Sequence, residues 1–281
     1  MVDAPAPLTI VVTGASAGIG AAAAVELTRR GHSVLAIGRS ATKLGGVRRQ
    51  MQQVAPAGLE VPEPEAADFA SLANVRALAD SLLERFPRID VLTNNAGLIL
   101  PRREESADGH EMIFAVNHLA PFLLTNLLVD RLRSSGGRVV TTSSEAHKGG
   151  RINEDDLQLH RWGRWRAYCQ SKLANVLFTS ELARRTGLPA TSFHPGLVRT
   201  EFGRGSFVKV LSTVVRPFYR TPEKGAETLV WLATGPEGAA PTAIYYTNCR
   251  PGRPTSDAQD PELARRLWEA SAALVALEPT S

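Results

Sequence analysis

The sequence has little of what secreted, membrane-spanning or disulfide-bonded proteins need. Its 281 residues include only two cysteines, Cys169 and Cys249. Two cysteines give no disulfide framework, so a reducing cytoplasm is the expected location. No window offers the ~18 uninterrupted apolar residues of a transmembrane helix. The start, MVDAPAPLTIVVTG, lacks a basic region and enters a strand pattern directly, so we expect neither a signal peptide nor a membrane span.

Aromatic residues are also scarce, at 6%, and no basic block is present. The net charge of +4 comes from 32 basic and 28 acidic residues spread along the chain. A nucleic-acid-binding protein more often shows a clustered basic stripe with interleaved aromatics, so no nucleic-acid partner is expected. The six histidines lack metal-ligand spacing such as H-E-x-x-H, so no metal site is expected. We interpret His118 and His194 as structural and keep His147 as a candidate substrate contact.

What the sequence does have is an alternation of short β-rich runs and longer helical stretches. Strand-like runs occupy 8–13, 33–38, 89–95, 137–144, 190–196 and 243–248, with a weaker run at 59–67. Helical patterns occupy 19–30, 71–85, 111–133, 166–186, 222–234 and 260–275. Near-continuous apolar runs in the first strands indicate burial on both faces, as in parallel sheets. The alternation predicts an α/β protein: a single-domain doubly wound Rossmann fold over residues 1–281 with a mostly parallel seven-stranded sheet.

A glycine-rich turn, TGASAGIG (13–20), lies between the first strand and the first helix. Its glycines permit a tight turn and close backbone approach, and the helix N-terminus offers N–H groups to a pyrophosphate. The spacing is G-x-x-x-G-x-G rather than G-x-G-x-x-G, and a flexible turn is the alternative interpretation. The position at the first strand–helix junction favours a dinucleotide site. The candidate contacts are Gly14, Ser16, Gly18, Ile19 and Gly20.

The end of the second strand predicts which dinucleotide binds. An acid there would bind the ribose 2′-hydroxyl, but the sequence reads Gly38-Arg39-Ser40. A guanidinium can bind a 2′-phosphate bidentately, whereas a carboxylate would repel it. NADP(H) is therefore the expected cofactor, with Arg39 and Ser40 as contacts. The alternative is that Arg39 is an ordinary solvated residue at a helix start.

The segment YCQSK places Tyr168 and Lys172 one helical turn apart, so both side chains share a face. A helix-surface pair is one interpretation. The other is a catalytic base, because a nearby ammonium and a positive nicotinamide ring would lower the phenol pKa from its usual value near ~10. Ser144 at the carboxyl end of the fifth strand, where such sheets bind ligands, favours the catalytic interpretation.

Together these residues resemble the short-chain dehydrogenase/reductase family. The resemblance rests on TGASAGIG, NNAG (94–97), SS (143–144), YCQSK (168–172) and HPGLVRT (194–200), which follow the family's order. The segments VNHLAPFLLTNLL (116–128), YCQSKLANVLFTSELARR (168–185) and LARRLWE (263–269) are similar to its retinol-dehydrogenase-like branch.

The resemblance implies a catalytic set of Asn117, Ser144, Tyr168 and Lys172. Tyr168 would exchange the proton, Ser144 would bind the substrate oxygen, and Lys172 would also hold the nicotinamide ribose. Asn117 has a hint of its own, because Pro121 has no N–H to donate to the carbonyl four residues earlier. In the family that carbonyl holds a water that leads to the lysine. A packing kink in a long helix is the alternative.

The resemblance also implies further cofactor contacts and a substrate cover. The contacts are Asp68, Phe69, Asn95, Ala96, Gly97, Tyr168, Lys172, Pro195, Gly196, Val198 and Thr200. A lid is expected at 199–221, with apolar side chains facing an apolar ligand, and Trp162 and Trp165 could shape the pocket. The expected activity is NADP(H)-dependent hydride transfer between nicotinamide and the alcohol or carbonyl carbon of a small, apolar substrate. A non-redox epimerase or dehydratase and a non-catalytic NADP(H)-binding regulator are the alternatives, and homo-oligomerisation stays open.

Overall fold

A computed structural model describes residues 6–197, 220–240 and 245–277 of the protein. One eight-stranded sheet forms its centre, in the order β3-β2-β1-β4-β5-β6-β7-β8. All neighbouring strands pair in parallel except β7 and β8, which are antiparallel. The strands are β1 Thr9–Thr13, β2 Ser33–Gly38, β3 Glu65–Ala66, β4 Val91–Asn94, β5 Arg138–Thr142, β6 Ala190–His194, β7 Tyr245–Thr247 and β8 Arg250–Pro251. The doubly wound α/β prediction is confirmed, with one strand more than the seven expected.

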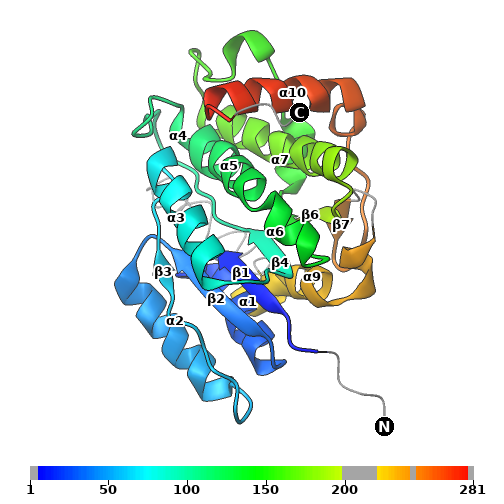
Figure 1. The fold of residues 1–281 in the computed structure, drawn as a ribbon. Coiled ribbons are helices and arrows are strands. Elements are labelled where there is room, and N and C mark those ends of the chain that lie inside the picture. The colour runs from blue at the N-terminus through cyan, green and yellow to red at the C-terminus, as the bar shows by residue number, and fades with distance from the viewer. Residues whose placement is uncertain (1–5, 198–219, 241–244, 278–281) are drawn as a thin grey trace.

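Helices cover both faces of this sheet (Figure 1). The longer ones are α1 Gly18–Arg29, α2 Ala41–Val54, α3 Leu72–Arg85, α5 Ala120–Leu127, α7 Arg164–Thr186, α9 Pro222–Thr234 and α10 Pro261–Leu274. Shorter α-helices are α4 Met112–Phe114 and α6 Val129–Ser134. Among the described residues, one turn is π-helical, η1 Ala115–Leu119, and four are 3₁₀-helical: η2 Glu145–Gly149, η3 Glu154–Asp156, η5 Pro236–Ala239 and η6 Asp257–Gln259.

Two apolar layers hold the helices to the sheet, and strand periodicity divides them. Val11 of β1 belongs to the layer under α3, α5 and α7, whereas its neighbours Ile10 and Val12 belong to the layer under α1, α2 and α9. Successive side chains of a strand point to opposite faces, so a strand buried on both faces is apolar throughout. The near-continuous apolar runs of the sequence therefore indicated a sheet covered on both sides.

Helix α2 was missing from the predicted elements. Its apolar residues Leu44, Val47 and Met51 are buried at helical spacing, and Ser40 caps it by accepting from the Lys43 N–H at 3.4 Å. Two adjacent glycines, Gly45 and Gly46, weaken the helical pattern, because glycine costs about 1 kcal/mol relative to alanine in a helix. Burial against β2 outweighs this cost.

The predicted helix 111–133 is in fact interrupted. The turn η1, which contains Asn117, is π-helical between α4 and α5, and α6 begins after a further break. A π-helical turn carries wider i to i+5 hydrogen bonds and often marks functional positions. Pro121 follows directly in α5, where it has no N–H to donate. The sequence thus located the irregularity but not its form.

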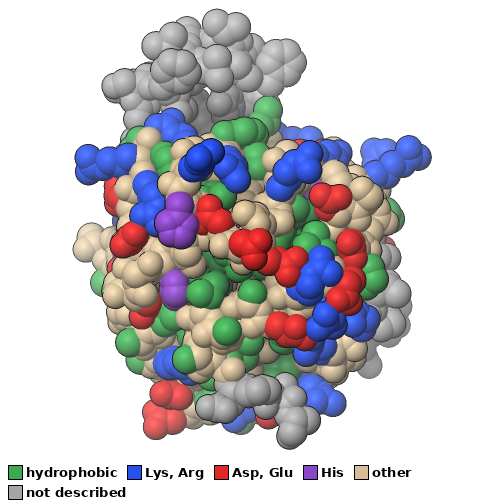
Figure 2. Space-filling view, turned by 90° about the horizontal axis from the view of Figure 1, so that it is seen from above, with side chains coloured by type: hydrophobic (Ala, Val, Ile, Leu, Met, Phe, Trp, Pro, Cys, Tyr) green, Lys and Arg blue, Asp and Glu red, His purple; other side chains and the backbone are tan. Residues whose placement is uncertain are grey.

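The molecular surface around α10 carries charges of both signs (Figure 2). Arg265 pairs with Glu262 at 2.5 Å, and Arg266 reaches Glu154 at 2.8 Å. This face is therefore mixed rather than uniformly basic. None of the helices in the described ranges is long and apolar enough to cross a membrane.

Candidate active site

The carboxyl ends of the parallel strands bring the predicted residues to one edge of the sheet. The glycine turn follows β1, Asn95 follows β4, Ser144 follows β5 and Pro195 follows β6. Parallel strands all end on the same side, so motifs far apart in the sequence meet there. This is the place where ligands bind to open α/β sheets.

The glycine turn after β1 needs its glycines for two different reasons. Gly14 and Gly18 have φ angles of +69° and +59°, a region that other residues rarely adopt. Gly20 instead needs room: a Cβ there would lie 2.4 Å from the Gly14 carbonyl oxygen. The N-cap Ala17 gives α1 no side-chain cap, and the first turn carries no acid. The uncapped N–H groups fit the pyrophosphate of a dinucleotide.

Asn95 fastens this turn to the neighbouring strands. Its Nδ2 donates to the Thr13 carbonyl at 3.0 Å, and its Oδ1 accepts from Thr142 Oγ1 at 3.2 Å. The Thr13 hydroxyl accepts from the N–H groups of Asn95 and Ala96 at 2.9 and 3.1 Å. Sequence analysis missed Thr13 and Thr142, although each lies at the end of a strand that leads into the site.

The end of β2 lies against the glycine turn. A Cβ on Gly38 would come within 3.0 Å of the Ser16 Cβ, so these two segments touch. Arg39, the next residue, is exposed and forms no ion pair with any described residue. Its guanidinium is thus free to bind an anion beside the glycine turn. The Ser40 hydroxyl instead caps α2.

Asp68 and Phe69 follow β3 at the same edge. Asp68 Oδ1 accepts from the Ala70 N–H at 3.1 Å and stays partly exposed. Phe69 is buried among the apolar residues of the core. Only the backbone of Phe69 therefore faces the site, because its ring packs in the protein interior.

The Asn117 side chain hydrogen-bonds to two segments of the site. Its Oδ1 accepts from the Leu98 N–H at 2.7 Å, and its Nδ2 donates to the Leu98 carbonyl at 3.0 Å and to Ser171 Oγ at 3.0 Å. A Cβ on Gly97 would lie 3.2 Å from the Asn117 Oδ1 and 3.7 Å from the Lys172 Nζ. Asn117 thus joins the segment after β4 to α7 beside the lysine.

The Lys172 side chain is buried and points to the carboxyl end of β5. Its Nζ donates to the Thr142 carbonyl at 3.1 Å and lies 5.6 Å from the centre of the Tyr168 ring. Burial lowers the pKa of Lys172 to about 8, because an ammonium loses its hydration there. At neutral pH the side chain is still mostly a cation.

Tyr168 and Ser144 meet at the mouth of the site through a hydrogen bond between their side chains. Burial raises the pKa of Tyr168 to about 12, and the Ser144 hydrogen bond opposes that rise. The direction differs from the lowered pKa expected from the lysine. Desolvation of the phenolate is the largest cause of the rise, and the Lys172 ammonium lies 5.6 Å from the ring centre. Without a bound cofactor, the Tyr168 phenol is protonated and therefore neutral at pH 7.

Comparison with known proteins agrees with this geometry. The family model for short chain dehydrogenases matches residues 8–209. The chain is 44% identical over 274 residues to "Putative daunorubicin C-13 ketoreductase DnrU" of Streptomyces sp. (strain C5), which covers 95% of this chain and 92% of that protein. It is 40% identical to Retinol dehydrogenase 14 of Homo sapiens, over 96% of this chain and 86% of that protein.

A solved structure of an uncharacterized protein from Mycobacterium Paratuberculosis superposes with a TM-score of 0.76 at 34% identity, over 98% of this chain and 97% of that one. The chain belongs to the short-chain dehydrogenase/reductase family. Its relatives place it in the retinol-dehydrogenase-like branch, as the sequence motifs had indicated. Members of this family are oxidoreductases that act on alcohol or carbonyl groups of small molecules.

The turn η2 of this short-chain dehydrogenase fixes the backbone just after Ser144. Tyr245 in β7 donates its hydroxyl to Glu145 at 3.0 Å, and the Glu145 N–H donates to His194 Nδ1 at 3.3 Å. His147 is completely buried, with Nδ1 2.7 Å from the Ser144 carbonyl and its ring against Tyr245. The described contacts of the His147 ring are with the Ser144 carbonyl and with Tyr245, and a substrate contact through His147 stays a prediction.

An apolar cluster borders Tyr168. Ile113, Leu159 and Ala167 form its buried centre, and the partly exposed side chains packed on them are Leu98, Ile99, Leu100, Trp162 and Tyr168. The Trp162 indole N–H donates to the buried Glu111 carboxylate at 3.0 Å. This short-chain dehydrogenase thus has an apolar wall beside its tyrosine, with Trp162 held in place.

The segment after β6 is only partly described. Pro195 and Gly196 lie at the expected edge, and Gly196 has a φ of +88°. A Cβ on Gly196 would also lie 2.7 Å from the Cδ of the flexible Arg220 side chain, so the backbone angle is the stronger reason for glycine. Val198, Thr200 and nearly all of the predicted lid at 199–221 lie outside the described residues.

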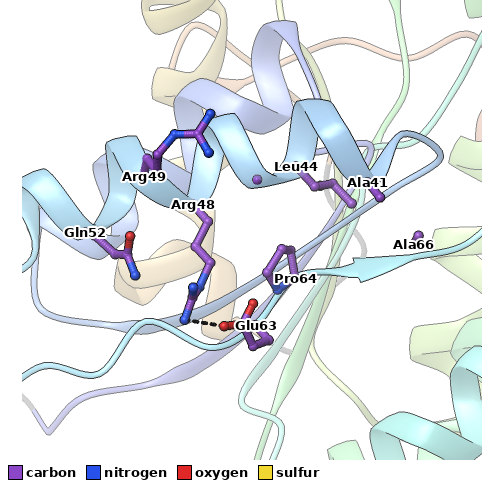
Figure 3. A pocket seen from close by; sticks show the side chains of 9 residues that line it. Ala41, Leu44, Arg48, Arg49, Gln52, Glu63, Pro64 and Ala66 are labelled. Carbon is purple, nitrogen blue, oxygen red and sulfur yellow. Dashed lines mark ion pairs between the residues drawn. The ribbon is translucent and has the colours of Figure 1, made fainter.

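A pocket of about 350 Å³ lies away from these residues, between α2 and the segment that leads to β3 (Figure 3). Arg48 reaches across it to Glu63 at 2.6 Å, while Arg49 points away from that pair. The catalytic edge of the sheet does not line this pocket. In the described ranges, no group of three or more His, Cys, Asp or Glu residues is arranged to hold a metal ion.

Proposed function

We propose that the protein is an NADP(H)-dependent oxidoreductase that transfers a hydride between nicotinamide and the alcohol or carbonyl carbon of a small, apolar substrate. The observation that carries the proposal is the Ser144–Tyr168 hydrogen bond one helical turn from the Lys172 ammonium. A phenol, a hydroxyl donor and a cation at one strand edge form a general acid with a site for the substrate oxygen.

The residues present also fit the cofactor. The uncapped start of α1 supports a pyrophosphate site, the exposed Arg39 supports a 2′-phosphate, and Lys172 with Asn95 and Gly97 would border the nicotinamide ribose. When bound, the nicotinamide supplies or accepts the hydride. NADP(H) is favoured over NAD(H) because no acid follows β2 to bind a free 2′-hydroxyl.

The protein's own groups handle the proton and the substrate oxygen. Ser144 would donate to the carbonyl oxygen as negative charge develops on it. The neutral Tyr168 phenol would then give its proton to that oxygen, and the Lys172 ammonium would stabilise the phenolate that remains. Alcohol oxidation would run these steps in reverse, with Tyr168 as the base.

The substrate is proposed to be apolar because the wall beside Tyr168 is apolar. The similar proteins are named for retinol and daunorubicin C-13 chemistry, which agrees with a bulky carbon skeleton. The cytoplasmic location and the single-domain organisation remain part of this proposal.

The test is a screen for NADPH oxidation by apolar aldehydes, ketones and quinones. We expect stoichiometric conversion of the carbonyl compound to its alcohol by the wild-type protein, and conversion at least ~10²-fold slower by Tyr168→Phe at the same concentration. Substrate isomerised or dehydrated without net NADPH oxidation would instead favour an epimerase or dehydratase. Tight NADPH binding with no turnover of any carbonyl compound would favour the regulator.

A further inference from the structure

One face of α7 continues past the catalytic tyrosine on the side away from the lysine. Arg164 and Trp165 precede Tyr168 by four and three residues, and Lys172 follows it by four. Residues at these spacings share a helix face. Lys172 points to the end of β5, so Arg164 and Trp165 lie about 6 Å along the axis on the opposite side of Tyr168.

Trp165 is the more exposed of the two large hydrophobic side chains that stand open in the described ranges, at 63%. Its ring centre lies 5.7 Å from that of Tyr168, with the planes tilted by 37°. A single exposed tryptophan needs no explanation by itself. This one extends the apolar wall beside Tyr168, and the second such residue, Leu197 at 58%, follows Gly196 at the same edge.

Arg164 adds a positive charge next to this tryptophan. It is partly buried, and no carboxylate in the described ranges lies within ion-pair distance of it. Two acids of the preceding loop have other partners, since Asp156 binds His160 and Glu154 binds Arg266. The N-cap Gly163 gives no side-chain cap, and the first turn of α7 has no acid. An anion at this end would meet both a guanidinium and free N–H groups.

We propose that the substrate is a carbonyl or alcohol compound with a flat apolar body and a carboxylate at the end away from the cofactor. Trp165 contacts the flat body, and Arg164 binds the carboxylate. Both act as specificity-determining residues, because they set which carbonyl compound reaches Tyr168 without taking part in proton transfer. This inference rests on the proposed oxidoreductase function and modifies its substrate class: the substrate keeps an apolar body but carries an anionic group at one end.

The test compares 6-acetyl-2-naphthoate with its methyl ester, which has the same ketone and ring system but no charge. We expect wild-type protein to reduce the acid with the higher kcat/KM. Arg164→Gln should lower kcat/KM for the acid about tenfold, the effect of losing one charge-assisted contact, and leave the ester nearly unchanged. Arg166→Gln is the matched control, an exposed arginine two residues on that donates to the Arg161 carbonyl, and should leave the acid-to-ester ratio at its wild-type value. Trp165→Ala should lower kcat/KM for both compounds.

Binding of both compounds to the NADPH complex, measured by titration calorimetry, separates this inference from the function on which it rests. Tighter binding of the acid that is lost in Arg164→Gln supports the inference even if neither ketone is reduced, and the proposed function then fails alone. Reduction of both compounds with an acid-to-ester ratio that Arg164→Gln does not change overturns the inference and leaves the function intact. Failure of wild-type protein to bind the acid more tightly than the ester also overturns it.

Discussion

At the scale of single residues, the site combines groups whose protonation the protein itself sets. Burial keeps the Tyr168 phenol neutral and lowers the pKa of the Lys172 ammonium to about 8. The phenol therefore starts as a proton donor, the form that carbonyl reduction requires. In the proposed reduction, the Lys172 ammonium would stabilise the phenolate that remains after proton transfer. Arg39 is the single residue proposed to bind the 2′-phosphate at the other end of the cofactor.

Replacing Arg39 by alanine should reduce the preference for NADPH over NADH. The loss of one charge-assisted contact to a phosphate typically costs ~1.5–3 kcal/mol, or roughly 10- to 150-fold in affinity. Titration of wild-type and Arg39→Ala protein with both cofactors measures it, and NADH affinity serves as the internal control. An unchanged ratio of the two affinities would show that Arg39 is an ordinary solvated side chain.

Tyr168→Phe should keep NADPH affinity near the wild-type value and lower single-turnover hydride transfer ~10²- to 10⁴-fold, the usual contribution of general acid–base catalysis. Lys172→Met should lower both turnover and NADPH affinity, because that side chain is assigned to both tasks. The two losses should not add in the double variant, since the residues act as one unit. Wild-type rates in Tyr168→Phe across pH would return the pair to a helix-surface role.

At the scale of elements, glycine has opposite roles in two segments. In the turn before α1 it is required by backbone angle and space, whereas in α2 neither reason applies. A Cβ on Gly46 would meet only the far end of the Arg49 side chain, at 3.9 Å, an ordinary contact. The same residue type thus builds the cofactor turn and weakens the helix beside it.

We therefore expect Gly46→Ala to raise the free energy of unfolding by about 0.5–1 kcal/mol, through better helix propensity and a smaller loss of backbone entropy. Gly20→Ala should instead abolish NADPH binding and destabilise the fold, since its Cβ would lie 2.4 Å from a carbonyl oxygen. Urea denaturation and NADPH titration of both variants measure these effects. A destabilised Gly46→Ala would mean that α2 needs glycine for another reason.

His118 links the π-helical turn to α10, with Nε2 2.9 Å from Ser271 Oγ. Complete burial lowers the pKa of His118 to about 4. Because the unfolded state has the higher pKa, it binds the proton first as the pH falls from about 6.5 towards 4, and stability is lost in that window. This histidine should account for about 2 kcal/mol of the loss between pH 7 and pH 5.

His118→Gln keeps a hydrogen-bonding group near Ser271 but cannot titrate, so its unfolding free energy should fall less between those two pH values than that of wild type. His160→Gln is the control, because the His160 ring is 79% exposed. Parallel urea titrations at both pH values give the comparison. An equal pH dependence in all three proteins would rule out His118 as the acid-sensitive group.

At the scale of the whole molecule, a single sheet carries both apolar layers. Because the two layers cover the two faces of the same strands, the loss of either layer would expose one apolar face of the whole sheet. Strands from the first and last thirds of the chain, β1 and β7, lie in that one sheet. We propose on this basis that the chain is one cooperative domain.

Calorimetry should then show one thermal transition, with equal calorimetric and van 't Hoff enthalpies. NADPH in excess should shift that transition upward as a whole, since it binds only the folded state. Two separated transitions, or a shift in only part of one, would contradict a single domain.

The sequence by itself determined the fold class and the place of the glycine turn, and it named the residues of the proposed catalytic set. These features are local patterns: the periods of strands and helices, a glycine turn at one junction, and Tyr168 one turn from Lys172. Local patterns can be recognised in a sequence without knowing which distant residues are in contact. The prediction of a short-chain dehydrogenase/reductase of the retinol-dehydrogenase-like branch is confirmed by the comparison with known proteins. The missed helix α2 shows the limit, because Gly45 and Gly46 masked a burial pattern that was present.

Only the tertiary structure decided what depends on residues far apart in the chain. The hydrogen bonds from Asn95 to Thr13 and Thr142 join three strands, and no spacing in the sequence encodes them. The direction of the Tyr168 pKa shift depends on how completely the fold removes water from the phenol, which a four-residue spacing cannot show. Burial of His147 beneath Tyr245 comes likewise from the pairing of β6 with β7. Desolvation and long-range contacts are properties of the packed chain, and they set the chemistry of residues that the sequence had already named.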